Sequence, residues 1–588
     1  MKSFFKYVLA TMLGLILASI LMFFITIGVI SAMVASQDEP VKIKEHTILH
    51  MKLNQVIADR SDKNPFGDFN FPSFQPITKV GLDDILKNLK KAKSDPNIDG
   101  IYLDLTAIPA GIATIEEIRN ALIDFKESGK FIISYSDNYT QPSYYLATVA
   151  DKVYMNPEGL LMFVGLRSEI MFFKDAMEKL GIEPQIIRHG KFKSAVEPFM
   201  YNKMSDENRE QIMTYVGSIW DHILKGISDE RNISIKKLNE LADNLDLKNA
   251  ELAVENGLID ELKYKDEIIA ELAELTGKEN EKDIEHIKLG KYTKVPDKKR
   301  KKLEKDKIAV VYASGTVMMG EGEEGTIGSD RISRAIRKAR KDSSIKAIVF
   351  RVNSGGGSAL ASEVIWREVN LAQEVKPVIA SLGDVAASGG YYIVAPAQKI
   401  IASPNTITGS IGVFGLLFNG KELLNDKLGV HVDVVKTNDF ADIGTFNRRL
   451  TAQEREVIQF SIEEIYETFI THVAEGRGMT KEEVDEIGQG RVWSGTNALE
   501  IGLIDGFGGL EDAIAMAAEA ANLETYRTVG YPKLKDPFEQ IIEELQGNVR
   551  VSILKNELGE EYKYYQALQD IVNQDGIQAR IPYKVEIY

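Results

Sequence analysis

The 588-residue sequence predicts an α/β fold made of two tandem copies of one unit, and three observations support this. From Val80 onward, short apolar segments alternate with amphipathic segments, which is typical of strand–helix–strand units. The same pattern returns further along, where Ile348–Val352 matches Ile101–Leu105 at a distance of 247 residues. The length also exceeds that of a single domain of common size.

The first expected element is a membrane helix. Lys2 and Lys6 precede an uncharged run of 31 residues, 7–37. A bilayer needs about 20 apolar residues, and the apolar core of a cleavable signal peptide has only about 7–15. The run therefore favours an uncleaved signal anchor at residues 1–37, with a cleaved signal peptide as the alternative. The lysines before the run and the acidic residues 38 and 39 after it favour an N-terminus inside the cell.

The next elements form a first copy, which we place at 38–294. Apolar segments predict strands at 47–53, 101–105, 131–135 and 185–188, and amphipathic segments predict helices at 83–92 and 115–127. Residues 62–76 show no periodicity and predict a loop. A basic run at 295–307 predicts a solvated linker.

The second copy is placed at 308–531, followed by a C-terminal extension at 532–588. At the offset of 247 residues, identical residues recur without a gap, and the matched pairs include Asp83 with Asp330, Tyr144 with Tyr391, Pro157 with Pro404, and Gly165 with Gly412. An internal duplication explains this agreement. In the extension, 538–545 is amphipathic and 583–588 is strand-like, without an assigned function.

The two copies differ where chemistry is expected. Ser388 follows a strand predicted at 377–382 and precedes an apolar helical stretch that starts at Tyr391, so it occupies a tight strand-to-helix turn. Such a turn exposes a nucleophile, although a serine that caps a glycine-rich helix would have the same pattern. The first copy has Gln141 at this position.

A glycine loop follows the preceding strand of the second copy only. Gly356 and Gly357 can present backbone N–H groups to an oxyanion, although a plain strand-to-helix turn remains the alternative. A dinucleotide fingerprint is excluded because Leu360 occupies the position of its third glycine.

A serine nucleophile needs a base, and the sequence restricts the candidates. There is no cysteine, and His431 and His472 of the second copy lie in no catalytic motif. Lys193 of the first copy lies among small and apolar residues, whereas the second copy has Phe440 at the matching position. Burial would lower the pKa of such a lysine toward neutrality, and a solvated surface lysine is the alternative.

Composition excludes other classes of function. The net charge of −16 argues against a nucleic-acid-binding protein. The seven histidines lack the spacing of a metal-binding motif, so we expect neither a catalytic metal nor a cofactor.

Three motifs carry a family resemblance: GKFKSAVEP at 190–198, AASGGYY at 386–392 and TGSIG at 408–412. With the anchor and the duplication, they resemble the long, duplicated form of bacterial signal peptide peptidase A (protease IV). The resemblance extends over the chain to about residue 532, with one departure, Gly355, where the family pattern has proline.

The resemblance implies a membrane-anchored serine endopeptidase with Clp-protease/crotonase-like domains. It implies Ser388 as nucleophile, Lys193 rather than Lys191 as general base, and Ser410 as a hydroxyl that holds the lysine amine. The backbone of Gly356, Gly357 and Gly389 would form the oxyanion hole.

The resemblance also implies the setting of the enzyme. Its substrates would be cleaved signal peptides and other apolar peptides, and the protein would be a homotetramer. It would cross the bacterial inner membrane once, with a cytoplasmic N-terminus and the catalytic domains outside the cytoplasm. Two alternatives stay open: a crotonase-like acyl-CoA enzyme, and a catalytically silent membrane scaffold.

Overall fold

The computed structural model describes residues 2–37, 41–61, 79–297, 304–323, 325–534 and 577–581. The predicted loop at 62–76, residues 298–303 of the basic run, the amphipathic stretch at 538–545 and the strand-like stretch at 583–588 lie outside these residues.

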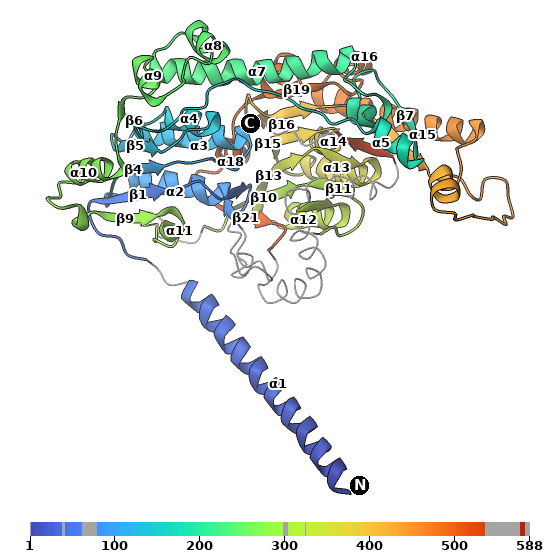
Figure 1. Ribbon diagram of the computed structural model, residues 1–588, viewed down its shortest axis with the longest axis horizontal. Helices are drawn as coiled ribbons and strands as arrows, with labels where there is room; N and C mark the ends of the chain where they lie inside the picture. The colour runs from blue at the N-terminus through green and yellow to red at the C-terminus, as the bar shows by residue number, and fades with distance from the viewer. Residues whose placement is uncertain are drawn as a thin grey trace.

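The first copy is a parallel sheet covered by helices (Figure 1). The strand order is β8-β6-β5-β4-β1-β9, and every neighbouring pair is parallel. Its strands are β1 (Thr47–Met51), β4 (Ile98–Asp104), β5 (Phe131–Ser136), β6 (Lys152–Met155), β8 (Glu261–Leu262) and β9 (Glu285–Lys288). Its helices include α2 (Leu82–Ser94), α3 (Ile112–Lys126), α4 (Gln141–Ala147), α5 (Lys174–Leu180), α6 (Glu197–Met200), α7 (Asp206–Arg231), α8 (Ile235–Asp243), α9 (Ala250–Glu255), α10 (Lys265–Leu275) and α11 (Leu289–Tyr292).

The second copy repeats this sheet with one antiparallel addition. The order is β19-β17-β15-β13-β10-β21, with β16 on β15 and β20 on β16, and only β17 and β19 run antiparallel. Its strands are β10 (Lys307–Ser314), β13 (Ile345–Ser354), β15 (Val378–Ala387), β16 (Lys399–Ala402), β17 (Ile407–Gly409), β19 (Val492–Ser494), β20 (Gly506–Phe507) and β21 (Arg527–Tyr531). Its helices include α12 (Ser329–Lys341), α13 (Ala359–Gln373), α14 (Gly389–Tyr392), α15 (Ala452–Arg477), α16 (Lys481–Ile487), α17 (Gly495–Glu500) and α18 (Leu510–Ala520).

The duplication is confirmed element by element. Helix α12 has both bounds 247 residues after those of α2, and α13 relates to α3 in the same way. One expectation needs correction: the helix after Ser388 is not a long apolar stretch from Tyr391, because α14 has only four residues, while β15 extends to Ala387.

A third sheet lies where the two copies meet. Its order is β12-β11-β14-β22-β18-β7, from β12 (Thr326–Gly328), β11 (Thr316–Met318), β14 (Gly356–Ser358), β22 (Gln578–Arg580), β18 (Phe414–Asn419) and β7 (Glu183–Arg188). Short strands β2 (Val56–Ala58) and β3 (Lys79–Gly81) pair separately. Because β7 belongs to the first copy and β18 to the second, this sheet joins residues far apart in sequence.

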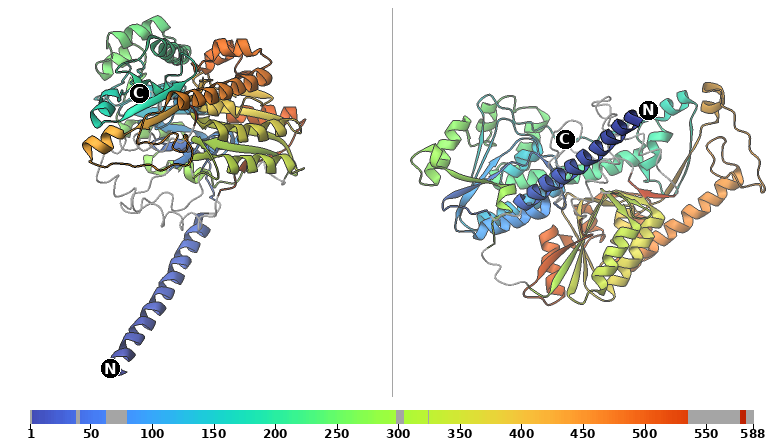
Figure 2. Two further views of the ribbon diagram at one scale, coloured as in Figure 1. Left: turned by 90° about the vertical axis from the view of Figure 1, so that its right-hand side faces the viewer. Right: turned by 90° about the horizontal axis from the view of Figure 1, so that it is seen from below.

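One apolar core is continuous across the copies. Leu49 and Ile101 of the first sheet share a buried cluster with Val349 of the second sheet and Leu510 of α18. Helix α7 lies along both copies and contacts β19 (Figure 1). The two copies therefore form one body, seen from two further sides in Figure 2.

Residues Lys2–Gln37 form one helix, α1, which leads away from this body (Figures 1 and 2). Among the described residues, no helix has the combination of length and apolarity that a membrane span requires.

Candidate active site

Ser388 lies at a strained turn between β15 and α14. Its φ of 55° and ψ of −119° are unusual for a residue with a side chain, and its N–H donates to the Gly409 carbonyl at 2.8 Å. Such a conformation costs of order 1–3 kcal/mol and persists only where surrounding contacts impose it. The turn fixes the direction of the hydroxyl, as in the nucleophile elbow of other hydrolases.

The Lys193 side chain reaches this hydroxyl from the other copy. Its Nζ donates to Ser388 Oγ at 2.8 Å, to Ser410 Oγ at 3.0 Å and to the Ser410 carbonyl at 3.2 Å. The side chain is fully buried, and this burial holds the pKa of Lys193 well below its usual value of 10.5. The neighbouring Lys191 is exposed, with its Nζ 5.2 Å from the Phe192 ring centroid.

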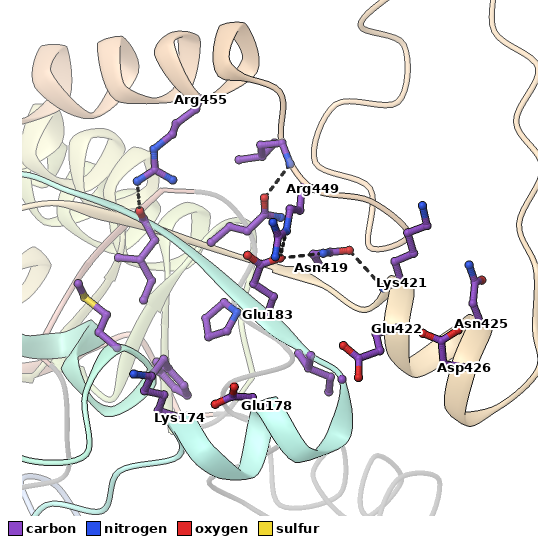
Figure 3. Close-up of a pocket in the computed structure, with 18 of the residues that line it drawn as sticks. Lys174, Glu178, Glu183, Asn419, Lys421, Glu422, Asn425, Asp426, Arg449 and Arg455 are labelled. Atoms are coloured by element: carbon purple, nitrogen blue, oxygen red, sulfur yellow. Dashed lines mark hydrogen bonds and ion pairs between the residues drawn. The ribbon is translucent and has the colours of Figure 1, made fainter.

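Strand pairing across the copies positions the lysine loop. β7 runs antiparallel to β18, from Glu183 opposite Asn419 to Arg188 opposite Phe414. Side chains extend this contact (Figure 3): Asn419 and Arg449 donate to the Glu183 carboxylate, at 2.9 and 2.5 Å. A surface pocket of about 990 Å³ lies beside this joint, and the lysine and both serines are not among its lining residues.

Gln211 of α7 holds the loop from the other side. Its Nε2 donates to the Phe192 carbonyl at 3.2 Å and to Ser194 Oγ at 2.9 Å, while its Oε1 accepts from the Val492 N–H at 3.0 Å. Because Lys193 lies between the first two partners, this buried amide fixes the backbone that carries the amine.

The predicted oxyanion glycines lie next to Ser388, but they are not equivalent. The Gly356 N–H donates to Ser354 Oγ at 3.1 Å, so the structure does not leave it for an oxyanion. Gly356 has a φ of +95°, and a Cβ built on it would lie 2.7 Å from the Gly389 nitrogen. Gly356 thus allows two backbone segments to approach closely, and the N–H groups of Gly357 and Gly389 remain as candidate oxyanion donors.

A buried ionic cluster behind the glycine loop was not expected from the sequence. Arg351 of β13 is fully buried, with its Nε 2.8 Å from Asp59 Oδ1 and its Nη2 2.6 Å from Glu117 Oε1. Burial raises the pKa of both carboxyls and Arg351 opposes this, so the net pKa of Asp59 is lowered whereas that of Glu117 stays raised. An arginine inside an apolar strand was the available signal.

The remaining candidates lie elsewhere. His431 is exposed, and His472 pairs with Glu363 at 3.0 Å and stacks on Trp366, with centroids 3.5 Å apart. Within the described ranges, no group of three or more histidine or acidic residues has a geometry that could hold a metal ion.

Comparisons with known proteins agree with the duplicated architecture. The model of peptidase family S49 matches the chain twice, at 124–279 and 370–524. "Protease 4" of Haemophilus influenzae is 38% identical over 76% of this chain and 74% of its own length, and "Protease 4" of Salmonella typhi is 37% identical over 81% and 78%. "Serine protease SPPA, chloroplastic" of Arabidopsis thaliana is 33% identical over 92% and 78%.

These relatives are peptidases, which favours peptide hydrolysis over an acyl-CoA reaction or a silent scaffold. The likeness of each copy to Clp-type proteases and crotonases stays a prediction. The chain belongs to peptidase family S49 and is a serine peptidase.

Proposed function

We propose that Ser388 and Lys193 form the catalytic dyad of this peptidase. Neutral Lys193 accepts the Ser388 proton, and Oγ attacks the peptide carbonyl. The Gly357 and Gly389 N–H groups stabilise the oxyanion. The resulting ammonium of Lys193, held by Ser410, then protonates the leaving amine, and water activated by the same lysine hydrolyses the acyl-enzyme.

The observation that carries this proposal is the 2.8 Å contact between Lys193 Nζ and Ser388 Oγ. Burial disfavours the ammonium form, which is the condition for a lysine to act as a base near neutral pH. The absence of a serine at Gln141 also supports a single dyad in each chain.

The test is hydrolysis of a short apolar peptide reporter by full-length protein in detergent, with three variants. Ser388→Ala and Lys193→Ala should each lower kcat/KM by about 10⁴-fold or more, because dyad members act as a unit. Lys191→Ala is the matched control, since its lysine is exposed, and should stay within about twofold. Activity that survives in folded Lys193→Ala would contradict the dyad.

We further propose that α1 is a single-pass anchor, with the peptidase on the outer side of a bacterial inner membrane. The uncharged run at 7–37 and the preceding lysines support this orientation. An enzyme anchored there meets cleaved signal peptides and other apolar peptides, and these are its proposed substrates. Protease protection in oriented membrane vesicles tests the topology.

The internal repeat supports a homo-oligomer. The offset of 247 residues relates 430–435 to β7 and 167–172 to β18. In the described part of the chain, neither 430–435 nor 168–172 belongs to a strand, and Val432 and Val435 are 51% and 98% exposed. A second molecule of the protein could supply the missing strand partner, as β18 does for β7 within one chain.

In this pairing, Val430, Val432 and Val434 of one molecule would lie opposite Phe172, Ile170 and Ser168 of the next molecule. Such a head-to-tail contact closes into a ring when the rotation permits. We propose a ring of four molecules, the homotetramer that the family resemblance implies.

A further inference from the structure

The C-terminal segment 577–581 lies beside the oxyanion glycines. Its strand β22 pairs antiparallel with β14 on one side, where Ala579 is opposite Gly357, and contacts Phe414 of β18 on the other. Outside the ladder, the Ile581 N–H donates to the Gly355 carbonyl at 2.8 Å, and the Ala359 N–H donates to the Ile577 carbonyl at 3.3 Å. A stretch of the chain thus occupies the groove between β14 and β18 as an extended peptide.

The register brings one carbonyl to the oxyanion position. Hydrogen-bonded and non-hydrogen-bonded pairs alternate along an antiparallel ladder. Since the pairs 355–581 and 359–577 are joined by hydrogen bonds, Gly357 and Ala579 form the hydrogen-bonded pair between them, and the Gly357 N–H faces the Ala579 carbonyl. The same oxygen lies 2.9 Å from a Cβ built on Gly389, so both proposed oxyanion donors lie beside it.

The segment is buried between its two neighbouring strands rather than exposed at the edge of the sheet. Ala579 is fully buried, and Ile581 is 7% exposed. Ser388, whose hydroxyl must be reached by any substrate, is also fully buried in this arrangement. The groove therefore accepts an extended peptide with a small residue at the carbonyl that meets the two amides.

We infer that the segment 577–581 is a substrate-like inhibitor that occupies the peptide groove of its own chain. This inference rests on the proposed function and adds its regulation. Peptide substrates must displace β22 before they reach Ser388, so the apparent affinity for substrate is the intrinsic affinity multiplied by the fraction of molecules with an open groove.

The chain contains no cysteine, so an engineered disulfide can lock the segment in place. Ser358 and Gln578 are opposite residues of β14 and β22 and form a non-hydrogen-bonded pair, whose Cα atoms are about 4.5 Å apart in such ladders. A disulfide accepts this separation. The test protein is the full chain with Ser358→Cys and Gln578→Cys, compared with itself before and after mild oxidation.

Oxidation should give a disulfide within one chain, lower the rate of peptide-reporter hydrolysis at least tenfold, and allow recovery when a reductant is added. The two single-cysteine variants are matched controls, since neither can form an internal disulfide, and their rates should not change. Two results would overturn the inference: no internal disulfide in the folded protein, or full disulfide formation with an unchanged rate. A disulfide that forms between two chains would overturn the assignment of the segment to its own groove.

Failure of the proposed function gives a different pattern. In that case the reduced protein and the wild type hydrolyse nothing and Ser388 does not react with a fluorophosphonate, whereas the disulfide still forms. The inhibitory role then fails together with the proposed function. The disulfide, which still forms, shows that the segment occupies the groove and that the proposed function is what failed.

Discussion

Lys193 has surroundings that oppose its charge. Its amine meets two serine hydroxyls and one carbonyl, and its pKa is lowered by burial. The same burial that makes the amine a useful base costs folding free energy below the pKa of a free lysine, because the unfolded chain binds the proton that the folded chain lacks. Stability attributable to this group therefore rises with pH.

The activity should depend on pH in the same direction. Below the pKa of Lys193 the amine holds a proton and cannot accept one from Ser388, so kcat/KM should fall about tenfold per pH unit. Because burial lowers this pKa, the rising limb should lie well below pH 10.5. The check is a pH profile of kcat/KM for wild type and Lys191→Ala, which should coincide. A limb near 10.5 would mean that the base is a solvated lysine.

At the scale of elements, the active site depends on where two strands and one helix place the lysine loop. β7 fixes the loop through β18, and α7 fixes it through Gln211. Neither β7 nor α7 touches the Ser388 hydroxyl. Their effect on catalysis is therefore positional, and it should appear in kcat more than in KM.

Gln211→Leu keeps the volume of the side chain but removes its four hydrogen bonds, which join it to Phe192, Ser194, Val492 and Asn208. We expect kcat to fall by about 10–100-fold, since a displacement of about 1 Å can cost that much, with KM nearly unchanged. Steady-state kinetics check this, with Thr214→Ala on the exposed face of α7 as control. A change in KM alone would indicate a substrate contact instead.

The sequence predicted the paired elements well because the duplication doubles the signal. Ser388 and Lys193 became candidates because each copy lacks the residue that the other keeps, and the choice of Lys193 over Lys191 rested on the family resemblance. The pairing of β7 with β18 was not predicted, since no local pattern records a partner in the other copy. β22 was missed because three residues of mixed polarity carry no periodicity, and Arg351 was overlooked inside a segment taken as an ordinary buried strand.

At the scale of the whole molecule, the copies are joined by buried charge as well as by the apolar core. Arg351 belongs to the second copy, and its partners Asp59 and Glu117 belong to the first. A buried pair of this kind stabilises little in net terms, but removal of one partner leaves uncompensated charge. The cluster therefore makes the joint between copies intolerant of change.

Arg351→Met should lower the free energy of unfolding by about 3–5 kcal/mol, because it leaves two buried carboxyls without their cation. The matched control is Arg334→Met, which breaks an exposed pair with Glu321 and should cost less than about 1 kcal/mol. Urea unfolding followed by circular dichroism measures both. Equal effects would show that the buried cluster contributes no more than a surface pair.

The proposed ring can be broken without damage to the fold. Val432→Asp places a charge on a side chain that is exposed in one chain, so the chain should fold and the oligomer should dissociate. Light scattering after size exclusion should give the mass of one chain for Val432→Asp. Wild type and the exposed control Val375→Asp should give the mass of four chains. A wild type that is already monomeric in detergent would reject the ring.

The distance of 195 residues between Lys193 and Ser388 also has a consequence in time. A ribosome adds about 5–20 residues per second, so roughly 10–40 seconds separate the synthesis of the proposed base from that of the proposed nucleophile. During that interval the nascent chain holds an amine without a hydroxyl to activate. If the proposed dyad is correct, proteolytic capacity begins only after both halves have been translated and have folded against each other.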